Sequence, residues 1–138
     1  MKRLRILLCD DEPLMLSWLQ SVLEPDYTVV GTAEDGHSLI AAAQAMRPDL
    51  ILTDINMPAL NGLDAVRELR PLLPECRVIF HTSRSEPEIM AAAFLAGAAG
   101  YVIKGSSQSL VSSLRTVIRQ VHDRDEAVTI RHSTQPMV

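Results

Sequence analysis

The chain has 138 residues, 47% of them hydrophobic and 22% charged, and a formal net charge of −4. This length and composition are typical of one globular domain that buries a core without disulfide bonds. The negative charge gives this segment no electrostatic basis for binding nucleic acid. No apolar stretch reaches the ~20 residues of a membrane span, and the residues after Lys2 do not form a secretory signal. We therefore expect a cytoplasmic domain without direct nucleic-acid or membrane contact.

The two cysteines, Cys9 and Cys76, lie in apolar stretches and form no CxxC or metal-type spacing. In a reducing compartment such cysteines are more often buried free thiols than partners in a disulfide. We expect both to be free thiols.

Short apolar runs alternate with helical patterns along the whole chain. Runs that lack a period of two indicate strands covered on both faces, as in a parallel sheet. These runs lie at residues 5–9, 27–30, 50–53, 77–80 and 100–103. Between and after them, apolar residues at helical spacing predict five helices. The alternation predicts an α/β domain with a five-stranded parallel sheet and helices on both faces.

The first helix is expected to begin at Pro13, where the missing N–H of proline costs nothing. Its i, i+3, i+4, i+7 pattern predicts a buried stripe made of Met15, Trp18, Leu19 and Val22. At the other end of the chain the apolar periodicity is lost. We expect a folded domain over residues 1–122 and a polar tail or truncated linker over residues 123–138.

Polar residues occupy the carboxyl ends of four predicted strands: Asp10 and Asp11, then Asp54, then Thr82, then Lys104. These ends share one edge of a parallel sheet, where open α/β sheets bind their ligands. Three carboxylates repel one another unless a cation lies among them, and oxygen ligands of this kind suit Mg²⁺. Metal, ammonium and hydroxyl together match the oxygens of a phosphoryl group. Asp54, at the centre, is placed to act as the nucleophile.

Several of these residues also have a purely structural interpretation. Asp54 could cap the following helix, although Asn61 and Gly62 already supply turn residues there. The acids at residues 10–12 could complement the dipole of the first helix. His81 is expected to be a partly buried structural histidine. The convergence of four strand ends favours the functional interpretation for the acids.

In this order and at these strand ends, the residues resemble the CheY-like receiver domain of two-component response regulators, over residues 4 to about 121. The resemblance implies a flavodoxin-like (βα)5 fold with strand order 2-1-3-4-5. It is closest to the receivers of DNA-binding transcription regulators that carry a helix-turn-helix partner. Residues 123–138 are too few to form such a partner.

The resemblance also assigns the reacting group and the metal ligands. Asp54, followed by Ile55-Asn56-Met57-Pro58, corresponds to the phosphoacceptor of the family. Asp10 and Asp11 correspond to its acidic pair. The carbonyl two residues after the acceptor, here that of Asn56, is a further ligand. The implied Mg²⁺ ligands are therefore Asp10, Asp11, Asp54 and Asn56.

The same comparison gives roles to residues near the fourth and fifth strands. Lys104 matches the family's lysine, although Gly105 stands where proline is common. Thr82 matches the switch hydroxyl, which acts in catalysis as well, and Tyr101 matches the switch aromatic. Phosphorylation is expected to change the face formed by the fourth helix, fifth strand and fifth helix, and to control a homodimer or another output there.

The implied function is a signalling switch rather than an enzyme. Asp54 would take a phosphoryl group from the phosphohistidine of a sensor histidine kinase in a Mg²⁺-dependent reaction that the domain itself catalyses, followed by slow autodephosphorylation. One alternative is an interaction module of the same shape without phosphoryl turnover. A further alternative is an aspartyl-phosphate phosphatase of the haloacid-dehalogenase type. That family needs a second Asp where this chain has Asn56.

Overall fold

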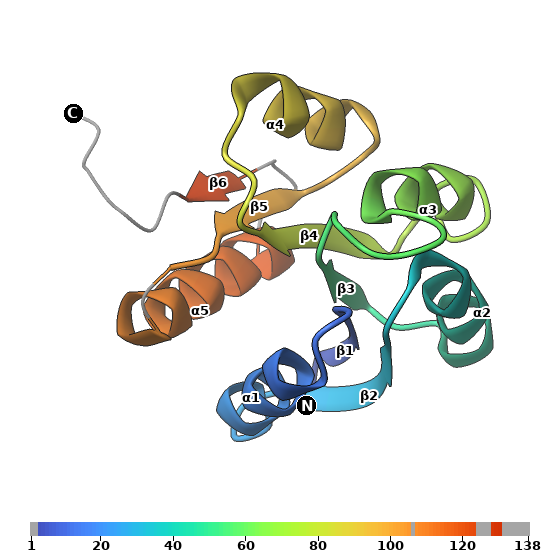
Figure 1. Ribbon diagram of the computed structural model, residues 1–138. Helices are drawn as coiled ribbons and strands as arrows, with labels where there is room; N and C mark the ends of the chain where they lie inside the picture. The colour runs from blue at the N-terminus through green and yellow to red at the C-terminus, as the bar shows by residue number, and fades with distance from the viewer. Residues whose placement is uncertain (1–2, 106, 124–127, 131–138) are drawn as a thin grey trace.

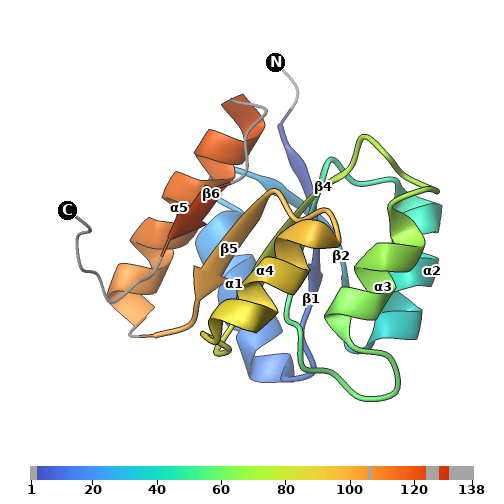
Figure 2. The same ribbon diagram turned by 90° about the horizontal axis from the view of Figure 1, so that it is seen from above.

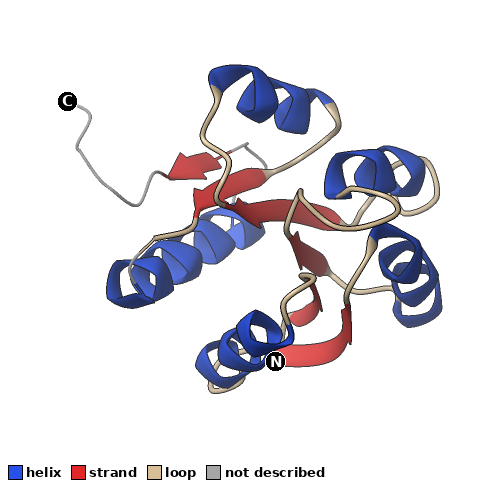
Figure 3. Ribbon diagram, viewed as in Figure 1, coloured by secondary structure: helices blue, strands red, loops and turns tan. Residues whose placement is uncertain are grey.

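The computed structural model describes residues 3–105, 107–123 and 128–130. It consists of one parallel sheet with helices on both faces (Figures 1 and 3). No helix among these residues is long and apolar enough to span a membrane. The elements in chain order are β1 (Arg5–Cys9), α1 (Pro13–Leu23), β2 (Thr28–Ala33), α2 (Gly36–Met46), β3 (Leu50–Thr53), α3 (Gly62–Leu69), β4 (Arg77–Thr82), α4 (Pro87–Leu95), β5 (Gly100–Ile103), α5 (Ser107–Asp123) and β6 (Val128–Ile130).

Over the described residues the strands lie in the order β2-β1-β3-β4-β5-β6, and neighbouring strands are parallel. The five predicted strands and their order 2-1-3-4-5 are therefore confirmed. Every residue of β3 is buried, as are four of the five residues of β1. Because both faces of these central strands are covered, their sequences are continuously apolar. β2 pairs only with β1 and is partly exposed, as an edge strand.

The strand β6 was not expected from the sequence. Residues 124–127 and 131–138 of the predicted polar tail lie outside the described residues. Val128–Ile130, however, pair in parallel with Gly100–Val102 of β5. All three residues of β6 are β-branched, which favours a strand. A run of three is too short to be distinguished by periodicity from its polar neighbours.

Two hydrophobic cores lie on opposite faces of the sheet. Helices α1 and α5 cover one face, and α2, α3 and α4 cover the other (Figures 1 and 2). Alternate strand residues serve the two cores: in β4, Val78 and Phe80 belong to the core under α2–α4, while Ile79 belongs to the core under α1 and α5. The sheet is therefore packed against helices on both of its faces.

Helix α1 buries a different stripe from the predicted one. Its fully buried residues are Leu16, Leu19 and Leu23. Of the predicted residues only Leu19 is among them; Met15, Trp18 and Val22 pack at the margin of the core. The apolar residues of this helix occur on most of its circumference. Two adjacent stripes of them therefore fit the helical period almost equally well.

The turn after β3 depends on a close backbone approach at Gly62. Its N–H donates to the Ile55 carbonyl at 2.8 Å, and a Cβ atom at this position would lie 2.1 Å from the Asp54 carbonyl oxygen. Ala59 in the same turn has a φ of 68°, in the left-handed region. The residues after Asp54 are thus folded tightly back over the end of β3.

Gly62→Ala should therefore lower the free energy of unfolding by at least about 2 kcal/mol, because the new Cβ forces the backbone at Asp54 to shift. Gly31→Ala is the matched control, since its Cβ would meet only Leu7 at an ordinary 3.5 Å. Urea unfolding of both variants measures the difference. Equal stabilities of the two variants would contradict the close approach.

Candidate functional site

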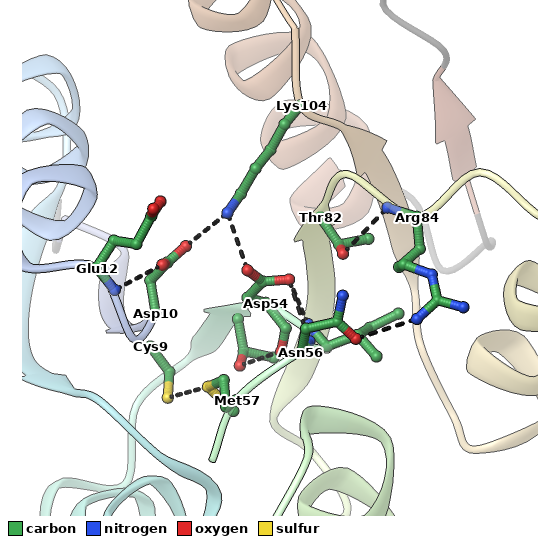
Figure 4. Close-up of polar contacts among 11 residues, drawn as sticks. Cys9, Asp10, Glu12, Asp54, Asn56, Met57, Thr82, Arg84 and Lys104 are labelled. Atoms are coloured by element: carbon green, nitrogen blue, oxygen red, sulfur yellow. Dashed lines mark hydrogen bonds and ion pairs between the residues drawn. The ribbon is translucent and has the colours of Figure 1, made fainter.

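Asp54 lies directly after β3 and is 7% exposed. Its N–H donates to the Cys9 carbonyl at 3.0 Å, which ties the end of β3 to the end of β1. One carboxylate oxygen, Oδ1, accepts from the backbone N–H of Ile55 at 2.6 Å and of Asn56 at 3.3 Å. The other, Oδ2, lies 2.9 Å from Lys104 Nζ (Figure 4). Asp54 is therefore held by its own turn and by a lysine from β5.

The structure excludes a helix-capping role for Asp54. The N-cap of α3 is Asn61, whose side-chain oxygen accepts from the Asp64 N–H at 2.9 Å. At the start of α1 the N-cap residue Glu12 forms no side-chain capping bond, and its N–H donates to Asp10 Oδ1 at 3.0 Å. Capping thus does not account for the position of Asp54, whereas the acids at residues 10–12 lie where they can also complement the dipole of α1.

Asp10 and Asp11 complete a cluster of three carboxylates with Asp54. One ligand oxygen from each residue can be chosen so that all three lie within 4.8 Å of one another. Asp10 is fully buried, whereas Asp11 is exposed. Such a set of oxygen donors, open to solvent through Asp11, fits a hard divalent cation that keeps part of its water shell. The predicted acidic residues are thus brought together, and they could hold a metal.

Lys104 is the cation that bridges the cluster. Its Nζ lies 2.9 Å from both Asp10 Oδ2 and Asp54 Oδ2, and its side chain is only 17% exposed. Burial acts to lower the Lys104 pKa, but the hydrogen bonds and charges of the two carboxylates outweigh it, and the pKa is raised. Burial is also the main reason why the pKa of Asp10 is raised, in spite of Lys104. The ionised Asp10 is therefore only partly compensated.

Thr82 and Tyr101 both contact the loop that follows β4. Thr82 is fully buried, and its hydroxyl oxygen accepts from the Arg84 N–H at 3.3 Å. Tyr101 is fully buried too, and its hydroxyl donates to the Arg84 carbonyl at 2.8 Å. The rings of Phe80 and Phe94 pack near it, each with its centroid 6.4 Å from that of Tyr101. The two residues thus anchor the same peptide segment.

Arg84 is a site residue that the sequence interpretation missed. Its Nη1 donates to the Asn56 side-chain oxygen at 3.2 Å, and its Nε and Nη2 donate to Glu86 at 2.8 to 3.1 Å. Asn56 is exposed beside Asp54, so this guanidinium lies over the mouth of the site (Figure 4). An arginine in a polar loop is not part of any sequence motif that would mark it as a site residue. Its position two residues after Thr82 was the one feature of the sequence that could have suggested a role.

His81 and the two cysteines are buried groups that stay uncharged at neutral pH. His81 is fully buried rather than partly buried, and burial and Lys104 lower its pKa to about 3, so the imidazole is neutral. Cys9 and Cys76 are buried free thiols, as expected. Burial raises the pKa of Cys9 to about 12 and that of Cys76 to about 11, so both stay protonated at neutral pH.

Comparison with known proteins agrees with this geometry. The family model described as "Response regulator receiver domain" matches residues 6–128. The chain is 33% identical over 120 residues to the uncharacterized transcriptional regulatory protein YxjL of Bacillus subtilis, covering 85% of this chain and 55% of that one. It is 38% identical over 101 residues to the nitrate/nitrite response regulator protein NarL of Escherichia coli, with 72% and 47% covered. The chain thus spans about half the length of these relatives.

A solved structure shows the same fold. The response regulator domain of Thermotoga maritima CheB superposes with a TM-score of 0.84 at 31% identity, covering 90% of this chain and 99% of that one. Fold, acidic cluster and sequence similarity point to one family. The chain belongs to the response regulator receiver domain family.

Proposed function

We propose that this domain is a phosphorylatable switch in which Asp54 accepts a phosphoryl group from the phosphohistidine of a sensor histidine kinase. One observation carries the proposal: the Asp54 carboxylate is held between Lys104, at 2.9 Å, and the oxygens of Asp10 and Asp11. A nucleophile between an ammonium and a cation site suits a reaction in which negative charge gathers on phosphoryl oxygens. The relatives are named as regulatory proteins, which favours a switch over an enzyme.

Asp10, Asp11 and Asp54, with the Asn56 carbonyl, would hold Mg²⁺, which neutralises phosphoryl charge when it is bound. An oxygen of Asp54 forms the new bond to phosphorus while the bond from phosphorus to the donor nitrogen breaks. Lys104 pairs with a phosphoryl oxygen and gives up one of its carboxylate contacts. Arg84 adds a second positive group at the mouth of the site. The product is an aspartyl phosphate on Asp54.

The switch step would begin at Thr82. A phosphoryl group brings about −1.5 to −2 charges and new acceptor oxygens next to this hydroxyl. Turning toward them breaks the weak bond from Arg84 N–H, while Tyr101 still holds the Arg84 carbonyl. Because Tyr101 is already inside the fold, the loop before α4 moves rather than the ring. The affected face is α4, β5 and α5, with β6 along the β5 edge, and a homodimer or partner would bind there.

Phosphorylation by acetyl phosphate with Mg²⁺ tests the function directly. Intact mass should show one added phosphoryl group on the wild type and none on Asp54→Asn, because Asp54 is the acceptor that we propose, held beside Lys104 and the acidic pair. EDTA should prevent the addition. A protein that never gains a phosphoryl group would favour an interaction module. Full labelling of Asp54→Asn would place the acceptor on another residue.

Asp10→Asn should raise the metal-free free energy of unfolding at pH 7, because burial opposes the ionised Asp10 carboxylate. Its pKa is raised in the folded chain, so the folded state binds the proton more tightly, and the ionised form opposes folding. The advantage of the variant should therefore appear as the pH rises through the Asp10 pKa and vanish below about pH 4. Thermal unfolding with EDTA across pH measures this. Added Mg²⁺ should stabilise the wild type more than the variant; the reverse would argue against the cation site.

Tyr101→Phe should loosen the loop before α4 without affecting Asp54. The lost hydrogen bond is worth about 1 kcal/mol, and the ring still packs against Phe80 and Phe94. Amide exchange should become faster at residues 83–86, while phosphorylation still proceeds. Tyr27→Phe, which removes a hydroxyl far from this loop, is the control. If exchange in the loop is the same in both variants, the anchoring role is wrong.

A further inference from the structure

A cavity lies at the opposite edge of the sheet from Asp54, at the amino ends of the central strands. Its volume is about 700 Å³, which falls within the range of small-molecule sites. Three segments form its walls: the start of β1, the connection from α2 into β3, and the connection from α3 into β4, with His122 of α5 at the rim. None of these residues takes part in the proposed phosphoryl chemistry.

The cavity is basic although the chain is acidic overall. Four arginines line it, against two acids, Asp49 and Glu75. The arginines are Arg3, Arg5, Arg47 and Arg77. The Asp49 carboxylate already accepts a hydrogen bond from the backbone N–H of Arg5 at 2.9 Å. In a chain of net charge −4, this excess of guanidinium groups is a local feature that attracts anions.

Arg5 and Arg3 build the wall of the cavity. The Arg5 guanidinium donates to the Met46 and Arg47 carbonyls at 2.8 and 2.7 Å, at the end of α2. Arg3 donates to the Tyr27 carbonyl at 2.8 Å and to that of Glu24. Each guanidinium has five N–H donors, so both keep donors for a ligand. Their positions are fixed by these backbone contacts before any ligand arrives.

Arg47 differs from the other three arginines. Among the described residues, its side chain makes no hydrogen bond or ion pair, and it is exposed at the cavity. Its backbone has φ 48° and ψ 64°, the left-handed conformation that commonly uses glycine at a helix end. Glycine would end helix α2 at this position with less backbone strain. The presence of an arginine with a free guanidinium here is therefore not explained by helix capping.

We propose that this cavity binds a small polyanion that carries two or more linked phosphate groups. Guanidinium groups bind phosphate oxygens in a bidentate manner, which lysines cannot do. The arginines come from three separate segments, so they surround a ligand rather than contact one side of it. The volume exceeds what a single phosphate ion fills, which favours a diphosphate or a larger phosphorylated molecule.

The experiment titrates the full chain with sodium pyrophosphate in metal-free buffer, followed by amide resonances and calorimetry. We expect one site, with shifts at residues 3–5, 47–50 and 75–77. Arg47→Gly should weaken binding about tenfold. The variant should still fold with a stability within about 1 kcal/mol of the wild type, because glycine suits φ 48°. Arg119→Ala, an equal loss of charge on the exposed side of α5, should change affinity less than twofold.

Asp54→Asn should bind pyrophosphate like the wild type, which separates this site from the phosphoacceptor. Citrate, which offers carboxylates in place of phosphates, should bind more weakly. The proposal is overturned by equal losses in Arg47→Gly and Arg119→Ala, by shifts confined to the residues around Asp10 and Asp54, or by no binding at millimolar pyrophosphate.

Discussion

The contact of Lys104 with Asp10 and Asp54 is the interaction on which the site depends. The three residues follow β5, β1 and β3, so the lysine reaches across the end of β4. Such a contact forms only when all these strands are parallel and end at one edge. Because the pair is largely buried, it is worth more than a surface ion pair, but its desolvation cost is also larger. The same ammonium compensates the carboxylates and must share them with any cation that enters.

The two edges of the sheet have opposite electrostatic character, and the helices explain why. In a parallel α/β fold the helix N-termini gather at the carboxyl edge of the sheet and the C-termini at the amino edge. The carboxylate cluster lies at the first edge. At the second, arginines donate to carbonyls at or just after the ends of three helices: Arg3 after α1, Arg5 at the end of α2 and Arg77 near the end of α5. A cation site and a basic cavity are thus both compatible with the direction of the chain.

The strands and the predicted acidic cluster could be inferred from the sequence because continuous apolar runs ended in charged residues. The parallel topology then required those charges to meet. Other features had no such signal. The buried stripe of α1 was placed on Met15, Trp18 and Val22 because its apolar residues fit two stripes. Arg84 was overlooked because its role depends on a contact with Asn56, 28 residues away in the chain. Tyr101 is fully buried because its ring packs against Phe80 and Phe94. The sequence around Tyr101 does not indicate this packing.

The short strand β6 has a consequence for association through the backbone. It pairs with Gly100–Val102, so that β5 has hydrogen-bonded neighbours on both sides along these residues. A strand from another molecule cannot add to β5 there without displacing β6. At this edge of the sheet a strand from another molecule would meet the backbone of β6 instead of that of β5. Strand β2 forms the opposite edge of the sheet. Its exposed Thr28 and Thr32 present little apolar surface to a strand from another molecule.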